Sequence, residues 1–302
     1  MTVENLKADR SAAARVFITG AGGLLGSVLV PHLVSCGYQV TAAPGRTGPG
    51  PTADLTRAQD VRRLLDQAQP DFIINLAALT NVDHCETHPD EAYRANAGLV
   101  LNLVHWLEAS GSRAHLVQIS TDQLYDGAGP HHEDAVCPTN VYAYSKCLAE
   151  EYARRVSGTS LRTNFFGRSR LQGRLSFSDW IVSSLRAGKT IPVFGDVLFS
   201  PLSLPTLARS IELVLRKPAP GVFNLGSLSG MSKADFAFAL ASAVGLPTQG
   251  LARGTVADVP LKARRPRDMR MDSEQFRIFG ARAPELRDEI ENVAGEYRDK
   301  TV

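Results

Sequence analysis

Tyr142 and Lys146 lie four residues apart in the segment YAYSK, a spacing that places both side chains on one face of a helix. No other tyrosine in the chain has a lysine four residues later. A free tyrosine hydroxyl has a pKa of about 10, which is too high for efficient proton exchange at neutral pH, and a neighbouring ammonium group lowers it. The pair therefore predicts acid–base chemistry at Tyr142, with Lys146 lowering the tyrosine pKa.

Thr121 supplies a hydroxyl upstream of this pair. It directly follows the apolar segment AHLVQIS, which is typical of a buried strand. Open α/β sheets hold their ligands at the carboxyl ends of such strands. A hydroxyl there can hydrogen-bond a carbonyl oxygen and stabilise the negative charge that develops on it. Thr121, Tyr142 and Lys146 are thus the predicted catalytic set for the reduction of a carbonyl group.

A glycine-rich turn, TGAGGLLG, joins the first expected strand to the first expected helix. Gly20 permits the tight turn, Gly23 lets the backbone approach a pyrophosphate, and Gly26 allows close packing of helix on strand. Free N–H groups at the helix N-terminus can bind phosphate oxygens. We expect the turn, with Leu24 and Leu25, to bind a dinucleotide cofactor, although a purely structural turn would show the same glycines.

The residues after the second expected strand bear on the choice of cofactor. An acidic residue there would bind the ribose hydroxyls of NAD, but the segment AAPGR contains none. Arg46 can hold a 2′-phosphate through two hydrogen bonds, which favours NADPH; NADH stays open as an alternative, because Arg46 can equally be a solvated loop charge. Asp54 and Leu55 are expected near the adenine edge, although an Asp before a helix is also a common N-cap.

The elements that must position these groups alternate between strand and helix. Apolar strands are expected at 15–19, 38–42, 71–78, 114–120 and 160–166, and helices at 24–37, 56–68, 89–109 and 139–156. Nearly continuous apolar runs are typical of strands that are buried on both faces. The sequence therefore predicts an α/β fold: a doubly wound parallel sheet of the Rossmann type with a smaller, mostly helical substrate lobe.

The second half of the chain is less regular, which suggests an interrupted second lobe. We expect a disordered polar tail at 1–14 and a dinucleotide-binding domain at 15–166, to which 191–226 returns. The remaining segments, 167–190 and 227–302, are expected to form the substrate-binding lobe.

Composition excludes several classes of protein. A net charge of +2 gives no reason to expect nucleic acid or an acidic membrane surface as a partner, and no apolar run is long enough to span a membrane. The four cysteines form no CxxC pair, which fits reduced thiols and a cytoplasmic location.

The chain resembles the extended short-chain dehydrogenase/reductase superfamily, which combines a TGxxGxxG turn, a YxxxK pair and an upstream Ser or Thr. Within it, the chain is similar to the dTDP-4-dehydrorhamnose reductase family. The matching segments are INLAALTNVDHCETHPDEAYRANA (74–97), STDQLYDG (120–127), YAYSKCLAE (142–150), LRTNFFG (161–167) and, more weakly, RRPRDMRMD (264–272). The resemblance implies that Thr121, Tyr142 and Lys146 act as the triad and that Ala77, Ala78 and Asn96 lie near the cofactor.

The same resemblance implies a substrate class, a nucleotide-activated (dTDP-type) 4-keto-6-deoxy sugar used in deoxysugar biosynthesis. Asp122, beside Thr121, is a candidate substrate contact. Phe177 and Trp180 are further candidates, because they can stack on a base or sugar, although aromatic residues at this spacing are also common in cores. Arg264, in a basic stretch, can hold a diphosphate or remain solvated.

Other functions stay open from the sequence. An epimerase of the same superfamily would keep its cofactor bound and return the hydride. A reductase-like regulatory subunit of methionine adenosyltransferase shares the resemblance and acts as a binding partner; a homodimer is also open. His84, Cys85 and His88 raise the question of zinc, but the family pattern accounts for this segment without a metal, so we expect none.

Overall fold

A six-stranded parallel sheet forms the centre of the computed structural model, which describes residues 13–45 and 52–298. Its strands run in the order β10-β5-β4-β3-β1-β2. Their bounds are β1 (Arg15–Thr19), β2 (Gln39–Ala42), β3 (Phe72–Asn75), β4 (His115–Ile119), β5 (Thr159–Thr163) and β10 (Gly221–Leu225). Every pairing in this sheet is parallel, and the apolar residues of β1 and β3 are buried except for the half-buried Phe72, as expected for strands covered on both faces. The predicted doubly wound fold is confirmed.

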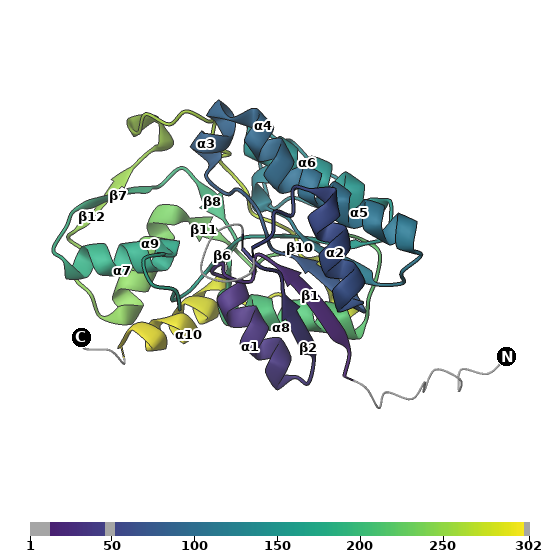
Figure 1. Ribbon diagram of the computed structural model, residues 1–302. Helices are drawn as coiled ribbons and strands as arrows, with labels where there is room; N and C mark the ends of the chain where they lie inside the picture. The colour runs from purple at the N-terminus through teal and green to yellow at the C-terminus, as the bar shows by residue number, and fades with distance from the viewer. Residues whose placement is uncertain (1–12, 46–51, 299–302) are drawn as a thin grey trace.

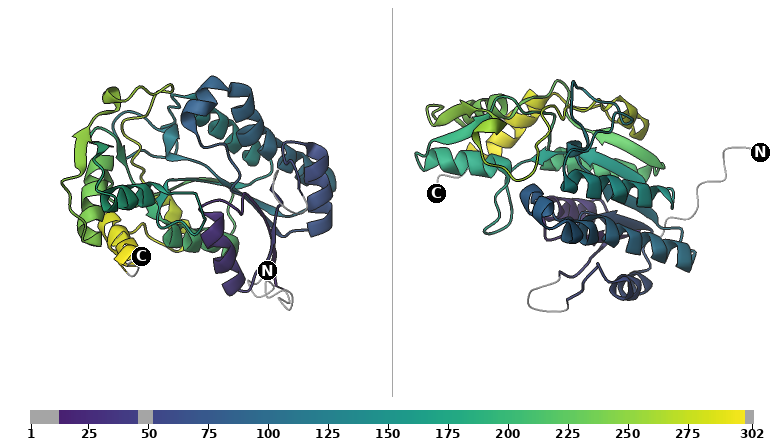
Figure 2. Two further views of the ribbon diagram at one scale, coloured as in Figure 1. Left: turned by 60° about the vertical axis from the view of Figure 1, so that its left-hand side comes forward. Right: turned by 90° about the horizontal axis from the view of Figure 1, so that it is seen from above.

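Helices cover both faces of the sheet (Figures 1 and 2). On one face lie α1 (Gly26–Ser35) and α8 (Leu204–Arg216), whose apolar side chains share a core with β1, β4 and β10. On the other face lie α2 (Ala58–Ala68), α5 (Leu99–Ser110) and α6 (Val141–Arg154). A short 3₁₀ turn, η2 (Asp122–Leu124), follows β4 and leads toward α6. This layering places the start of α6 beside the carboxyl end of β4.

The helix predicted at 89–109 is divided in the structure. It comprises α4 (Pro89–Ala92), a turn with π-helical hydrogen bonding (η1, Tyr93–Gly98) and α5, and α3 (Val82–Thr87) precedes it. The wide turn brings Asn96 inward, where its amide oxygen accepts from Leu79 N at 2.7 Å and its amide nitrogen donates to Leu79 O at 3.1 Å. These two bonds connect the helix to the loop after β3, a long-range contact that helical periodicity does not report.

The second lobe lies at the left of Figure 1 and has its own core. Its helices are α7 (Phe177–Arg186), α9 (Lys233–Val244) and α10 (Leu286–Arg298), with the 3₁₀ turn η3 (Val256–Asp258). Two small sheets complete it: β7 (Ile191–Phe194) with β12 (Leu251–Gly254), and β8 (Leu198–Phe199) with β11 (Met231–Ser232). The predicted small, mostly helical lobe is therefore present.

The boundary between the lobes differs from the expectation. The sequence predicts that 191–226 returns to the dinucleotide-binding domain, but β7 pairs with β12 and its apolar side chains pack in the core of the small lobe. The chain returns at β9 (Leu202–Ser203), which pairs with β6 (Phe165–Phe166). The 3₁₀ turn η4 (Glu274–Phe279) also packs against the main lobe, through two phenylalanines near β10. We propose lobe boundaries that follow these cores.

Two further expectations concern the termini and the membrane. The expected tail at 1–14 lies outside the described residues except for its last two positions. Within 13–45 and 52–298, no helix is both long and apolar enough to cross a membrane. Cys36, Cys85, Cys137 and Cys147 are all free thiols.

Candidate functional site

The glycine turn lies where the strand order reverses, because β1 is flanked by β2 on one side and β3 on the other. Ligands of open α/β sheets bind outside the carboxyl ends of the strands at such a point. Gly20 has φ +67°, and a Cβ atom there would lie 2.6 Å from Ala77 N. A Cβ on Gly26 would overlap the backbone of Ala21. Both positions therefore need glycine, whereas Gly22 faces open space.

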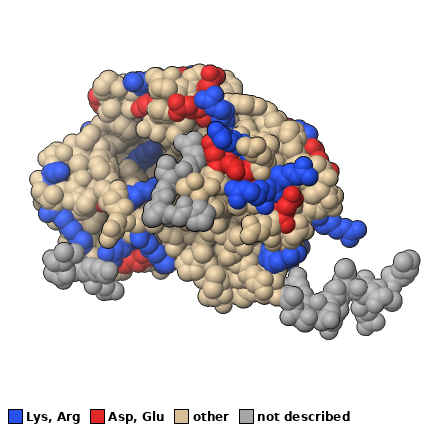
Figure 3. All heavy atoms as spheres, viewed as in Figure 1, with Lys and Arg blue, Asp and Glu red and all other residues tan. Residues whose placement is uncertain are grey.

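A cavity of about 760 Å³ opens in front of this turn. Figure 3 shows the same face hollowed between the lobes, with basic atoms at its floor. The predicted residues that line it are Gly20, Gly23, Leu24, Leu25, Gly26, Ala77, Ala78, Thr121, Asp122, Tyr142 and Lys146. The structure thus brings together the glycine turn and the predicted catalytic set, which lie about a hundred residues apart in the chain.

A second cavity of about 630 Å³ adjoins the first and shares Gly20, Ala77 and Ala78 with it. Asp54 and Leu55 line this cavity, as the adenine-edge prediction requires. The Asp54 carboxylate accepts from the backbone N–H of Thr56 at 3.1 Å and from its hydroxyl at 2.7 Å. Asp54 is not the N-cap of α2, which begins four residues later after Arg57. Arg46 lies outside the described residues.

Thr121 lies two residues after the end of β4, in a conformation that its own side chain stabilises. The hydroxyl accepts from Gln123 N at 3.2 Å, which caps η2, and it donates to the Asp122 carboxylate at 3.3 Å. Thr121 is buried and lines the cavity beside Tyr142. The Thr121 hydroxyl therefore caps the turn after β4, and Thr121 also forms part of the cavity wall.

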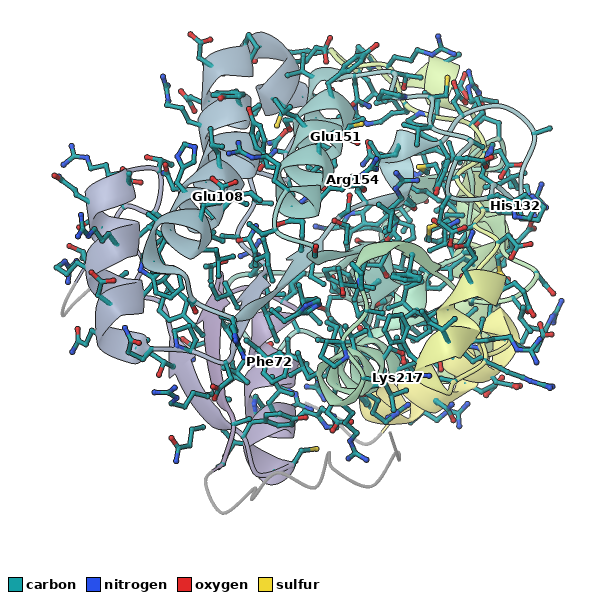
Figure 4. The ribbon with its side chains drawn as sticks, turned by 90° about the vertical axis from the view of Figure 1, so that its right-hand side faces the viewer. Phe72, Glu108, His132, Glu151, Arg154 and Lys217 are labelled. Carbon is teal, nitrogen blue, oxygen red and sulfur yellow. The ribbon has the colours of Figure 1, made fainter. Side chains whose placement is uncertain are left out.

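The inner face of α6 carries Tyr142, Lys146 and Glu150, each one helical turn from the next and all buried. Asn140 starts this helix by accepting from Ala143 N at 2.8 Å. The outer face is charged instead, and Figure 4 shows Glu151 pointing away from the sheet on the exposed side of the helix. The amphipathic helix thus fixes which of its residues face the cavity.

Burial raises the pKa of Tyr142 well above its ordinary value of 10. The nearby Thr121 side chain opposes this rise as a hydrogen-bond partner, and the Asp122 carboxylate adds to it. Lys146 is not among the groups that shift it, and the Lys146 Nζ donates instead to the backbone carbonyl of Ile119 at 2.6 Å. The net shift is therefore opposite to the sequence-based expectation, and Tyr142 is a protonated hydroxyl at neutral pH.

Lys146 is itself perturbed by its surroundings. Burial lowers its pKa from 10.5 to about 8, and the Glu150 carboxylate opposes this change. The bond to Ile119 O occupies one of the three hydrogens of the ammonium group. Two donors remain for other groups at this end of the cavity.

A buried ion pair supports the catalytic face of α6. Arg162 on β5 donates to Glu150 from Nε at 2.9 Å and from Nη2 at 2.6 Å, and both side chains are almost fully buried. Ser120 also donates to Glu150, and Arg162 donates to the hydroxyl of Tyr125 at 2.7 Å. These bonds connect α6 to β5 and to the end of β4, so they fix the distance between Thr121 and the helix.

Asp122, next to Thr121, is a buried carboxylate that lines the cavity. Lys233 of the small lobe interacts with it electrostatically. The Asp122 Oδ2 accepts from Asn164 Nδ2 at 2.7 Å, and burial raises the Asp122 pKa from 3.8 to about 6. Lys233, at the start of α9, opposes this rise. Its Nζ lies 5.8 Å from the ring centre of Phe177 and 5.9 Å from that of Phe199. Sequence reasoning missed both residues: Asn164 lies in the matching segment LRTNFFG but was given no role, and Lys233 comes from a segment without a recognisable motif.

Replacing Asp122 with asparagine should change how stability depends on pH. The folded state holds the Asp122 proton up to about pH 6, whereas the unfolded state releases it near pH 4, so this carboxyl destabilises the fold progressively across that window. The free energy of unfolding of Asp122→Asn relative to wild type should therefore rise by up to about 3 kcal/mol between pH 4 and pH 7. Urea denaturation at both pH values measures it; an equal difference at the two values contradicts the prediction.

Three predicted substrate contacts do not line the cavities of the catalytic set. Phe177 and Trp180 stack on one another at 6.0 Å and pack against the core of the small lobe. Arg264 is 69% exposed and pairs with Asp126 at 2.7 Å. Only Phe177 has a connection to the site, through Lys233. The aromatic pair matches the alternative stated for it, that of core residues.

Asn96 supports the loop that lines the cavities. It is completely buried and does not line either cavity. Its amide nitrogen donates to Ser145 Oγ at 2.9 Å as well as to Leu79 O. Asn96 therefore holds the Ala77–Leu79 loop against α6, behind the wall of the cavity.

The side chains that come together in the histidine segment are not the three that the sequence suggested for zinc. Cys85 is buried and donates to Leu79 O, and burial raises the pKa of its thiol to about 11. His84 and His88 stack at 4.1 Å, and His84 Nε2 lies 2.9 Å from Glu91 Oε2. The ligand atoms of His84, His88 and Glu91 lie close enough together to hold an ion, but these side chains lie at the surface along α3, α4 and the residue between them, and Cys85 is not among them.

Comparison with known proteins places this architecture in a family. The chain is 29% identical over 296 residues to a probable low-salt glycan biosynthesis reductase of Haloferax volcanii, covering 94% of this chain and 98% of that protein. It is 30% identical over 304 residues to a dTDP-4-dehydrorhamnose reductase of Aggregatibacter actinomycetemcomitans, covering 93% and 98%. It is also 28% identical over 293 residues to the methionine adenosyltransferase 2 subunit beta of Rattus norvegicus, covering 88% and 82%.

Solved structures show the same fold. A dTDP-4-dehydrorhamnose reductase of Bacillus anthracis in complex with NADP superposes with a TM-score of 0.85 at 24% identity, covering 94% of this chain and 100% of that chain.

The model of the RmlD substrate binding domain matches residues 14–298, which is nearly the whole chain. The protein therefore belongs to the RmlD substrate binding domain family, within the extended short-chain dehydrogenase/reductases that its motifs resemble.

Proposed function

We propose that this protein reduces the 4-keto group of a dTDP-linked 4-keto-6-deoxy sugar with NADPH. The observation that carries the proposal is that Thr121, Tyr142 and Lys146 line one cavity together with the glycine turn. The relatives from Haloferax and Aggregatibacter carry reductase names, and the latter acts on a dTDP-linked sugar. Site and family thus support the same reaction class.

The residues present fit a dinucleotide. Gly22 leaves open space where a side chain would stand, and a Cβ on Gly23 would lie 3.1 Å from Gly20 O. The glycine turn would hold the diphosphate, and the adjoining cavity with Asp54 and Leu55 would hold the adenosine half. The free donors of Lys146 would bind the ribose beside the nicotinamide. When bound, NADPH supplies the hydride for the substrate carbon.

The protein's own groups manage the oxygen of the substrate. Tyr142 is a protonated hydroxyl at neutral pH and would donate its proton to the carbonyl oxygen as negative charge develops there. The Thr121 hydroxyl, which borders the same cavity, would donate a hydrogen bond to that oxygen. Asp122 and Asn164 form the adjacent polar wall and can bind a sugar hydroxyl.

Product analysis tests the proposal. The protein is incubated with NADPH and a panel of nucleotide-linked 4-keto sugars, and the products are identified by NMR. A new secondary alcohol at C4, formed with one equivalent of NADPH consumed, supports the proposal. A stereoisomeric product formed with catalytic cofactor would indicate the epimerase alternative. Tight NADPH binding without any reduction would indicate the regulatory-subunit alternative.

Cofactor preference gives a separate prediction, which comes from the sequence. NADPH should bind more tightly than NADH, and Arg46→Ala should weaken NADPH binding by about 1–3 kcal/mol, the value of a charge-assisted hydrogen bond. NADH lacks the 2′-phosphate, so its affinity should not change. Titration calorimetry with both nucleotides measures the effect. Equal or tighter NADH binding to wild type would refute the preference, and unchanged NADPH affinity would remove Arg46 from the site.

A further inference from the structure

The loop between β6 and α7, residues 167–176, extends from the small lobe toward the glycine turn. Both of its ends are fixed. Arg168 Nη1 donates to Glu296 O at 2.8 Å, and Ser169 N donates to Asp179 Oδ2 at 2.9 Å. At the other end, Ser176 and Asp179 form a capping box at the start of α7. The ribbon of this loop protrudes from the lobe in Figure 2.

Arg174, two residues before the N-cap of α7, reaches the glycine turn of the other lobe. Its Nη1 lies 4.0 Å from the position that a Cβ of Gly23 would occupy. Arg174 also lines the 760 Å³ cavity, together with Gly22, Gly23 and the catalytic set. Because this contact joins residues about 150 positions apart, no spacing in the sequence indicates it.

The charge of Arg174 is unpaired within 13–45 and 52–298. None of the carboxylates described there forms an ion pair with it, and no hydrogen bond holds its guanidinium group. The neighbouring Arg168 is bonded to the backbone of α10. The first turn of α1, behind Gly23, contains no acidic residue that would compensate the charge. An uncompensated guanidinium group over a glycine turn complements the negative charge and the acceptor oxygens of a phosphate diester.

We propose that Arg174 binds the diphosphate of the nicotinamide cofactor and so joins the small lobe to the dinucleotide-binding domain. The inference rests on the proposed function for the presence of that cofactor. The glycine turn contacts the diphosphate through backbone N–H groups, whereas Arg174 adds a charged, bidentate contact from the opposite side. Arg174 is a positioning residue, since it lies at the phosphates and not at the reacting carbon.

Binding measurements on three nucleotides test this assignment. NADPH, NADH and ADP-ribose share the diphosphate, but only NADPH has the 2′-phosphate and ADP-ribose lacks the nicotinamide. Arg174→Ala should weaken all three by a similar factor, about tenfold, as expected for one partly exposed charge-assisted hydrogen bond. Arg174→Lys should recover part of the affinity. The loss should shrink as ionic strength increases, because salt screens an exposed charge.

Arg170→Ala is the matched control, because Arg170 is an exposed arginine of the same loop that does not line the cavity. It should leave all three dissociation constants within about twofold of wild type. Thermal unfolding of each variant checks that the loop change leaves the fold intact. Unchanged affinity in Arg174→Ala, or a loss confined to NADPH, overturns the assignment while leaving the proposed function in place. Failure of wild type to bind any of the three nucleotides overturns both.

Discussion

Tyr142→Phe should lower turnover by about 100-fold or more while leaving the fold and NADPH affinity close to wild type. The substitution removes one hydroxyl and keeps the ring that packs under the cavity. A placed general acid contributes about 10²–10⁴-fold to rate. The measurement is steady-state reduction of a dTDP-linked 4-keto sugar, with NADPH binding and thermal unfolding measured on the same sample.

Tyr144→Phe provides the control for this experiment. Tyr144 lies on the same helix two residues away but is 60% exposed on its outer face, so its hydroxyl should not affect the rate. Thr121→Val should also lower turnover with little effect on cofactor affinity, whereas Lys146→Met should weaken both. Turnover in Tyr142→Phe equal to that of wild type would show that another group delivers the proton.

Glu150→Gln should destabilise the protein by about 3–5 kcal/mol, the typical cost of removing one member of a buried ion pair. Glu150 accepts three hydrogen bonds from Arg162, whose charge would remain buried without a carboxylate. The bond from Ser120 would weaken as well, so the end of β4 and the catalytic face of α6 would lose a shared support. Chemical denaturation monitored by circular dichroism gives the free energy of unfolding.

The neighbouring Glu151 offers a close control. It pairs with Arg154 at 3.1 Å on the exposed side of the same helix, so Glu151→Gln should change stability by less than about 0.5 kcal/mol (Figure 4). Combining Glu150→Gln with Arg162→Met removes both charges and should cost less than the sum of the two single changes. A Glu150→Gln variant as stable as wild type would show that the pair does not support the site.

Local features of the sequence predicted much of the fold and part of the site. Apolar strands alternating with amphipathic helices specify a doubly wound sheet, because a strand buried on both faces must be covered by helices on both. The glycine turn is recognised from its spacing between strand and helix, and the local clash of a Gly26 Cβ with Ala21 agrees with it, whereas the need for glycine at Gly20 comes from the distant backbone of Ala77. Helix geometry alone places Tyr142 and Lys146 on one face.

Tertiary packing decided the features that depend on distant segments. Residues 191–199 joined the small lobe because their apolar side chains fit its core, and Phe177 and Trp180 became core residues for the same reason. The raised pKa of Tyr142 results from burial and from the Asp122 carboxylate, neither of which a spacing of four residues reports. Arg174 faces Gly23 only because the two lobes pack together. Spacing along the chain determines which side chains share a helix face, whereas the environment of each charge is set by the surfaces that fold against it.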